Sequence, residues 1–161
     1  MFRPDIVDVW IYRDGTAGPE VLLMRRVPGR VMPGLWQSVS GSVEADERIV
    51  DSALRELREE TGFERPVVEA FFDLDLVIPF HTSHVDAIVT TAVFAAHVRP
   101  DAEPVLSHEH DRYRWVPLQQ AIDEVIWPGY REAIRRIEEN LLDPVRALWF
   151  EIAPDGKNTV R

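Results

Sequence analysis

The sequence contains no cysteine. This absence excludes disulfide bonds, thiolate metal sites and a thiol nucleophile, and it fits a reducing compartment. The N-terminal residues lack a basic region followed by an apolar run, so they predict no secretory signal peptide. The longest apolar stretch, residues 87–98, is interrupted by two threonines and is too short to cross a bilayer. These absences predict a soluble, cytoplasmic protein without a membrane partner.

Lysine is almost absent, since Lys157 is the only one, and the chain has 18 basic residues against 28 acidic ones. Because a broad nucleic-acid surface requires a basic face, the net charge of −10 argues against a nucleic-acid partner. An acidic protein can still bind a polyphosphate if metal ions and a few arginines screen the charge. Most of the arginines fit a general composition bias, but Arg25 and Arg26 are candidates for phosphate contacts.

The length of 161 residues and the 45% hydrophobic content predict one globular domain with a real core. We expect this domain to span residues 1–145, followed by an extension of uncertain structure at residues 146–161. The hydrophobic pattern and the turn residues predict strands at 6–13, 20–27, 67–80, 85–98 and 111–116, a loop at 28–34, an extended segment at 35–43, and helices from Pro117 and at 130–142. This order predicts an α/β fold with a mixed sheet between helices.

A further helix is expected between the extended segment and the third strand, with Asp46 as its cap and Gly62 at its end. It carries Glu56, Glu59 and Glu60, which at this spacing share one helix face. Three like charges on one face destabilise an isolated helix, and a divalent cation would compensate them. Carboxylate oxygens on a rigid element suit Mg²⁺ or Mn²⁺, although an acidic surface face paired with arginines would look the same.

The spacing around these glutamates favours the metal site. The glutamates belong to a longer motif with fixed spacing. It consists of Gly41, five residues, Glu47, seven residues, Arg55-Glu56-Leu57, one residue, Glu59-Glu60, one residue and Gly62. This arrangement resembles the Nudix box at all its fixed positions. The resemblance to the Nudix hydrolase family covers most of the chain and implies an α/β/α sandwich with a catalytic loop–helix–loop motif.

The resemblance also implies a role for each matching residue. Glu59 and Glu60 match the principal metal ligands, and Glu56 matches a position that binds metal or acts as the catalytic base. Gly41 matches a glycine whose carbonyl ligates metal. Arg55 matches an arginine that orients the glutamates, and both Glu47 and Gly62 match structural positions of the motif.

Outside the motif, the segment from Trp36 to Glu44 resembles the dATP / dihydroneopterin-triphosphate pyrophosphatase branch of the family. In that branch an arginine at the position of Arg25 or Arg26 contacts phosphate. Ser40 could donate a hydroxyl group to the substrate, and Trp36 could form a wall for a base, although it could equally belong to the core.

One further acidic residue is a candidate catalytic group. Glu109 lies between two histidines, directly before a predicted strand. Several Nudix proteins supply an acidic ligand or base from a loop at this place, so Glu109 is the first candidate and Asp111 the second. An acidic residue of an ordinary surface turn is the alternative.

The sequence thus predicts a Mg²⁺-dependent pyrophosphohydrolase that cleaves a nucleoside triphosphate to a monophosphate and pyrophosphate. The alternatives are a hydrolase of ADP-ribose-type nucleotide sugars, suggested by Pro79, or of dinucleoside polyphosphates, and a non-catalytic nucleotide-binding domain. The sequence leaves open the base preference, the phosphorus attacked, the number of metal ions and whether the chain forms a homodimer.

Overall fold

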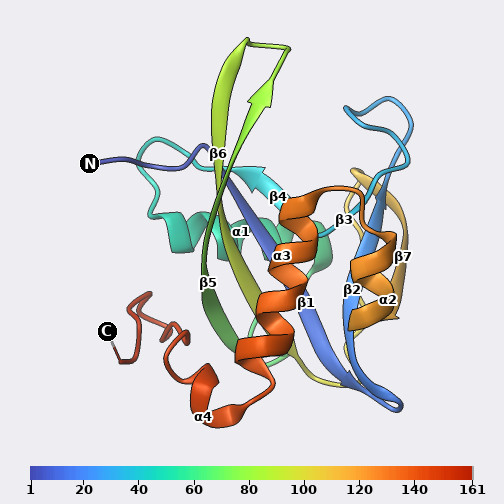
Figure 1. The fold of residues 1–161 in the computed structure, drawn as a ribbon, viewed down its shortest axis with the longest axis vertical. Coiled ribbons are helices and arrows are strands. Elements are labelled where there is room, and N and C mark those ends of the chain that lie inside the picture. Colours follow the sequence, from blue (N-terminus) through green and yellow to red (C-terminus); the bar gives the residue numbers. More distant parts are fainter. Residues whose placement is uncertain (161) are drawn as a thin grey trace.

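A mixed β-sheet lies between two helical layers in the computed structural model of the protein, which describes residues 1–160 (Figure 1). Its strands are β1 (Ile6–Gly15), β2 (Gly18–Arg26), β3 (Trp36–Gln37), β4 (Val39–Ser42), β5 (Val68–Thr82), β6 (Ala87–Val98) and β7 (His110–Pro117). Its helices are α1 (Ile49–Thr61), α2 (Leu118–Glu124), α3 (Pro128–Arg136), which continues into a π-helical turn at Ile137–Leu141, and α4 (Pro144–Ala147). The predicted α/β sandwich is confirmed.

The sheet has the order β3-β2-β1-β6-β5, with β4 added beside β1 and β7 beside β2. The pairing of β1 with β6 is parallel, whereas the other pairs are antiparallel. Because β1 pairs with β2 at its end and with β4 at its start, the extended segment before α1 enters the middle of the sheet. This insertion places the loop before α1 next to the centre of the sheet.

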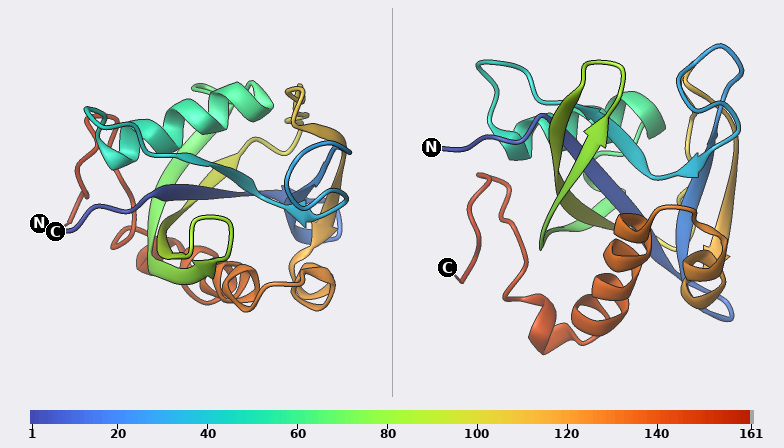
Figure 2. Two further views of the ribbon diagram at one scale, coloured as in Figure 1. Left: turned by 90° about the horizontal axis from the view of Figure 1, so that it is seen from above. Right: turned by 45° about the horizontal axis from the view of Figure 1, so that its top comes forward.

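Alternation along β1 divides the core into two clusters. Val7, Val9 and Ile11 pack in the cluster beneath α1, whereas Trp10 and Tyr12 pack in the cluster beneath α2 and α3. Both views in Figure 2 show α1 on one face of the sheet and the helices of the C-terminal part on the other. The predicted strand 6–13 is therefore buried on both faces rather than half exposed.

The beginning of α1 differs from the prediction. The helix begins at Ile49 with Arg48 as its N-cap residue, and no side chain caps it, so the expected cap by Asp46 is wrong. Asp46 lies instead in a turn that the amide of Glu47 closes by donating to the carbonyl of Glu44. The end of the helix is as predicted, since Gly62 has a left-handed φ of 72° and its amide donates to the carbonyl of Arg58.

The C-terminal segment packs along the outer edge of the sheet. Glu151 bridges to Phe72 of β5, and Ile152 is buried in the cluster beneath α1. Both guanidinium Nη atoms of Arg48 donate to the carbonyl of Asp155 at 3.0 Å. The division at residue 145 stays a prediction, but the segment after it contacts the start of α1.

Candidate active site

Helix α1 presents its three glutamates at very different depths. Glu59 is 53% exposed, the Glu56 side chain is 13% exposed, and the Glu60 side chain is 4% exposed. The helix contacts the sheet through the side that carries Leu57 and Glu60, both of which are buried. The predicted acidic face therefore runs from solvent into the contact between α1 and the sheet.

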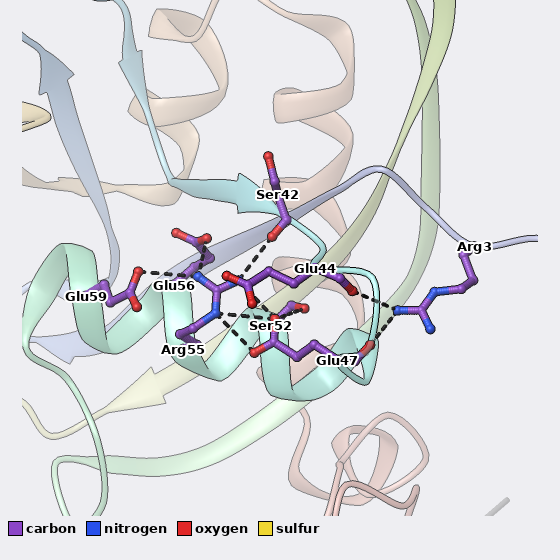
Figure 3. Close-up of polar contacts among 8 residues, drawn as sticks. All are labelled: Arg3, Ser42, Glu44, Glu47, Ser52, Arg55, Glu56 and Glu59. Atoms are coloured by element: carbon purple, nitrogen blue, oxygen red, sulfur yellow. Dashed lines mark hydrogen bonds and ion pairs between the residues drawn. The ribbon is translucent and has the colours of Figure 1, made fainter.

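Arg55 holds this part of the motif together (Figure 3). Its guanidinium group donates to both carboxylate oxygens of Glu47 at 3.0 Å, to Glu56 Oε1 at 2.6 Å and to Glu59 Oε2 at 3.3 Å. It also donates to the carbonyl of Ser42 at 3.1 Å. These charge-assisted bonds fix two of the predicted metal ligands relative to the loop before the helix.

Glu47 is the anchor of this arginine. Its carboxylate also accepts a hydrogen bond of 2.5 Å from the Ser52 hydroxyl group. The bonds from Arg55, followed by the bond from Ser52, lower the pKa of the Glu47 carboxyl group. Glu47 is thus ionised at neutral pH and holds Arg55 in place, which agrees with the structural role that the motif implies.

Gly41 allows the close approach of Glu56 to β4. A Cβ atom at this position would lie 1.9 Å from the Glu56 carboxyl carbon, so no other residue fits without displacing the carboxylate. The Gly41 backbone and the Glu56 carboxylate therefore form one cradle.

The Glu60 carboxylate is buried beneath this cradle. Oε1 accepts a hydrogen bond of 3.4 Å from the Ser40 amide, whereas Oε2 has no hydrogen-bond partner among residues 1–160. Oε2 lies 3.5 Å from Nδ1 of the buried His110. This ring nitrogen also lacks a hydrogen bond within the described chain. Burial, followed by the charges of Glu109 and Glu56, raises the pKa of Glu60 to about 9.

His110 is held on its other side by Gln37, whose amide nitrogen lies 3.1 Å from Nε2. Burial and the charge of Arg26 lower the pKa of His110 to about 4, so the imidazole is neutral at neutral pH. A neutral histidine cannot compensate an ionised Glu60. The sequence analysis did not include His110 or Gln37 in the site.

Glu109 lies beside the same carboxylates, although it comes from the loop before β7. Its charge raises the pKa of both Glu56 and Glu60. Arg26 Nη1 and Arg30 Nη1 lie 4.0 Å and 3.9 Å from its carboxylate, and its carbonyl accepts a bond from the Val27 amide. The loop 28–34 therefore positions Glu109 at the site.

The chemistry of this donor set fits a divalent cation. The charges of Glu109 and Glu56 both act on Glu60, Glu56 lies against Gly41, and one buried Glu60 oxygen lacks a partner in the described chain. Across residues 1–160, no three aspartate, glutamate or histidine side chains are arranged as a ready-made metal site, and Arg55 contacts both Glu56 and Glu59. A divalent cation, which prefers oxygen ligands, would stabilise the ionised form of Glu60 that burial disfavours.

The structure places the predicted substrate-binding arginines near the site but in contact with other groups. Arg25 forms a two-point ion pair with Asp111, at 2.9 and 2.8 Å. This pairing gives Asp111 a partner other than the glutamates. Arg26 donates to the carbonyl of Val31 at 2.7 Å and faces Glu109.

Trp36 and Ser40 belong to the strands beside these arginines. Trp36 is half-buried against the cluster beneath α2 and α3, and the Arg114 guanidinium group lies 4.3 Å above its ring. That face of the indole is covered and offers no free stacking surface. Ser40 connects the two faces of the sheet, because its amide donates to Glu60 and its hydroxyl group faces Asp8.

Comparison with known proteins agrees with this geometry. The family model described as the NUDIX domain matches residues 2–137. A Myxococcus xanthus protein named octanoyltransferase is 41% identical, over 74% of this chain and 33% of its own length. The CTP pyrophosphohydrolase of Escherichia coli is 32% identical, over 78% of this chain and 84% of the relative. The dihydroneopterin triphosphate diphosphatase of Haemophilus influenzae is 33% identical, over 68% of this chain and 74% of the relative. The chain thus spans only one third of the first of these relatives.

Solved structures show the same likeness. The dihydroneopterin triphosphate pyrophosphohydrolase of E. coli has a TM-score of 0.70 and 28% identity, covering 83% of this chain and 94% of that one. A Nudix hydrolase of Listeria monocytogenes has a TM-score of 0.73 and 26% identity, covering 87% of this chain and 95% of that one. The resemblance to the dihydroneopterin-triphosphate branch is therefore confirmed as a similarity. With the motif assembled around Arg55 and the family model spanning most of its length, this chain belongs to the Nudix hydrolase family.

Proposed function

We propose that this chain is a cytoplasmic pyrophosphohydrolase that depends on Mg²⁺ or Mn²⁺. Its substrate is a nucleoside triphosphate or a close analogue, which it cleaves to a monophosphate and pyrophosphate. The observation that carries the proposal is the group of three carboxylates, Glu56, Glu60 and Glu109, beside the Gly41 cradle. Two of the similar proteins are named as enzymes that act on triphosphates, which supports this substrate class.

The metal ligands that we propose are Glu56, Glu59, Glu60 and the carbonyl of Gly41. Glu59 is exposed and could turn from Arg55 toward an ion, whereas Glu60 would supply its unpartnered oxygen. A divalent ion held there would polarise a phosphoryl oxygen and lower the pKa of an attacking water molecule.

The protein's own groups would supply the proton transfer. Glu56 or Glu109 would accept the proton of the attacking water. Glu56 is held by Arg55 and Gly41, and therefore has a fixed position. Glu109 comes from a loop that two arginines contact loosely, so it can approach once substrate is bound.

The substrate's phosphates would meet Arg25 or Arg26, and the base would lie toward Trp36 and Ser40. Asp111 competes with phosphate for Arg25, whereas the Val31 carbonyl and Glu109 hold Arg26. Nucleotide sugars remain the alternative substrate class. The residue that suggests them, Pro79, lies in β5. A non-catalytic binding domain is disfavoured because the motif has retained each of its glutamates.

Replacing Glu60 by glutamine should cut turnover by about 100-fold or more, equal to ~3 kcal/mol of transition-state stabilisation, because it removes a buried ligand charge at nearly constant size. The comparison is kcat with saturating Mg²⁺ for the wild type, Glu60→Gln and the control Glu64→Gln. Glu64 is an exposed acid just after α1. A folded Glu60→Gln protein with the wild-type rate would contradict the metal assignment.

Glu109→Gln should lower kcat by about 10-fold or more without changing thermal stability, because Glu109 lies in a half-buried loop beside the site. Asp111→Asn is the matched variant, since Asp111 pairs with Arg25 instead of the glutamates. Rates and melting temperatures of both proteins should be measured together. Equal, small effects of the two substitutions would assign Glu109 to the surface.

A substrate panel tests the proposed function itself. Purified protein with Mg²⁺ should release pyrophosphate and a monophosphate from at least one dNTP, NTP or dihydroneopterin triphosphate, as separated by chromatography. ADP-ribose and dinucleoside polyphosphates belong in the same panel. Cleavage of ADP-ribose to AMP and ribose phosphate, with triphosphates left intact, would show that the nucleotide-sugar alternative is correct.

A further inference from the structure

The proposed reaction leaves one buried carboxylate of the sheet without a role. Asp8 in the middle of β1 is 5% exposed, and among residues 1–160 it forms no ion pair. The Ser40 hydroxyl group is the hydrogen-bond donor that faces it, and burial raises the pKa of the Asp8 carboxyl group to about 7. An acidic side chain in such a place costs folding free energy.

Asp8 lies on the face of the sheet that also carries the predicted substrate-binding residues. Alternation along β1 puts it with Trp10 and Tyr12, toward α2 and α3. In the strand pairing, Asp8 is opposite Ser40 and Trp36 is opposite Arg25. These four side chains therefore come from neighbouring strands and point to one side of the sheet.

The surroundings of Asp8 contain a second uncompensated polar group. The indole nitrogen of Trp10, two residues along the same face, is buried without a hydrogen-bond partner in the described chain. The Trp10 ring contacts Tyr130 of α3 edge-on, with centroids 5.2 Å apart. The negative charge of Asp8 acts on Tyr130, where it adds to the effect of burial in raising the pKa of the phenol. Asp8 therefore lies where the start of α3 meets the sheet.

Ser40 connects this carboxylate to the candidate metal site. Its amide donates to Glu60 Oε1, and its hydroxyl group faces Asp8. Ser40 therefore lies between Glu60, on the α1 side of the sheet, and Asp8, on the opposite side. Ser40, Trp36 and Tyr130 are half-buried, whereas Asp8 itself is buried.

We infer that Asp8 is a specificity-determining residue, whose carboxylate accepts a hydrogen bond from an amino group of the substrate's heterocyclic base. This inference rests on the proposed triphosphate hydrolysis. The carboxylate form of Asp8 offers only acceptors, so it selects rings that present N–H donors, such as cytosine, adenine, guanine or a pterin. A substrate that lacks the amino group would leave the buried charge unpaired and would be disfavoured.

The test uses substrate pairs that differ in one amino group. These are dGTP with dITP, dATP with the triphosphate of purine deoxyriboside, and dCTP with the triphosphate of the 2-pyrimidinone deoxyriboside. For the base that the wild type prefers, kcat/KM should favour the amino compound by about 10-fold or more. In Asp8→Asn and Asp8→Leu, this ratio should fall to within about 2-fold of unity.

A stability measurement separates this role from a structural one. Because both substitutions remove an uncompensated buried carboxylate, they should leave the melting temperature unchanged or raise it by about 3 °C. The control Asp101→Asn makes the same change in an exposed turn after β6 and should alter neither the ratio nor the melting temperature.

Three results would overturn the inference in different ways. Active Asp8 variants that keep the wild-type ratio would show that Asp8 does not contact the base, while the proposed function would stand. A wild type that cleaves no triphosphate would contradict the proposed function, and the inference with it. A large loss of melting temperature in Asp8→Asn would assign Asp8 a structural role.

Discussion

The ion pair between Glu47 and Arg55 is the contact on which the candidate active site depends. Glu47 belongs to the turn before α1, and Arg55 lies within the helix, 8 residues further along the chain. Through this pair the helix, the turn and the carbonyl of Ser42 in β4 become one rigid unit. Glu56 and Glu59 then take their positions from the same guanidinium group, so the arginine supplies both order and partial compensation of charge.

The compensation is incomplete where burial is deepest. Arg55 reaches Glu56 and Glu59, but Glu60 faces Glu109, the neutral His110 and the Ser40 amide. A buried carboxylate with a raised pKa and like-charged neighbours is a common property of functional sites. The fold sustains the cost of these carboxylates because α1 is anchored on a well-packed core.

The sequence was sufficient to predict the parts of this site that come from one continuous segment. The spacing from Gly41 to Gly62 predicted the helix and its glycine end, and the family resemblance predicted that Arg55 contacts the glutamates. The metal-binding roles of the glutamates stay a prediction. It could not predict the contact of His110 with Glu60, because these residues are far apart in the chain and meet only when β7 pairs with β2. It missed the start of α1, because Asp46 has the chemistry of a cap but its segment closes a turn instead. Asp8 is visible in the sequence as an acidic residue within a predicted strand. Its contact with Ser40 could not be predicted, because it depends on the register in which β1 pairs with β4.

Direct measurement of metal binding tests the central claim, that the carboxylates of α1 form a divalent-cation site. Mn²⁺ can be titrated into the protein while the free ion is followed by electron paramagnetic resonance. We expect the wild type to bind Mn²⁺, and the double variant Glu56→Gln/Glu60→Gln to bind it at least about 10-fold more weakly while remaining folded. Equal binding by the two proteins, or none by the wild type, would contradict the account.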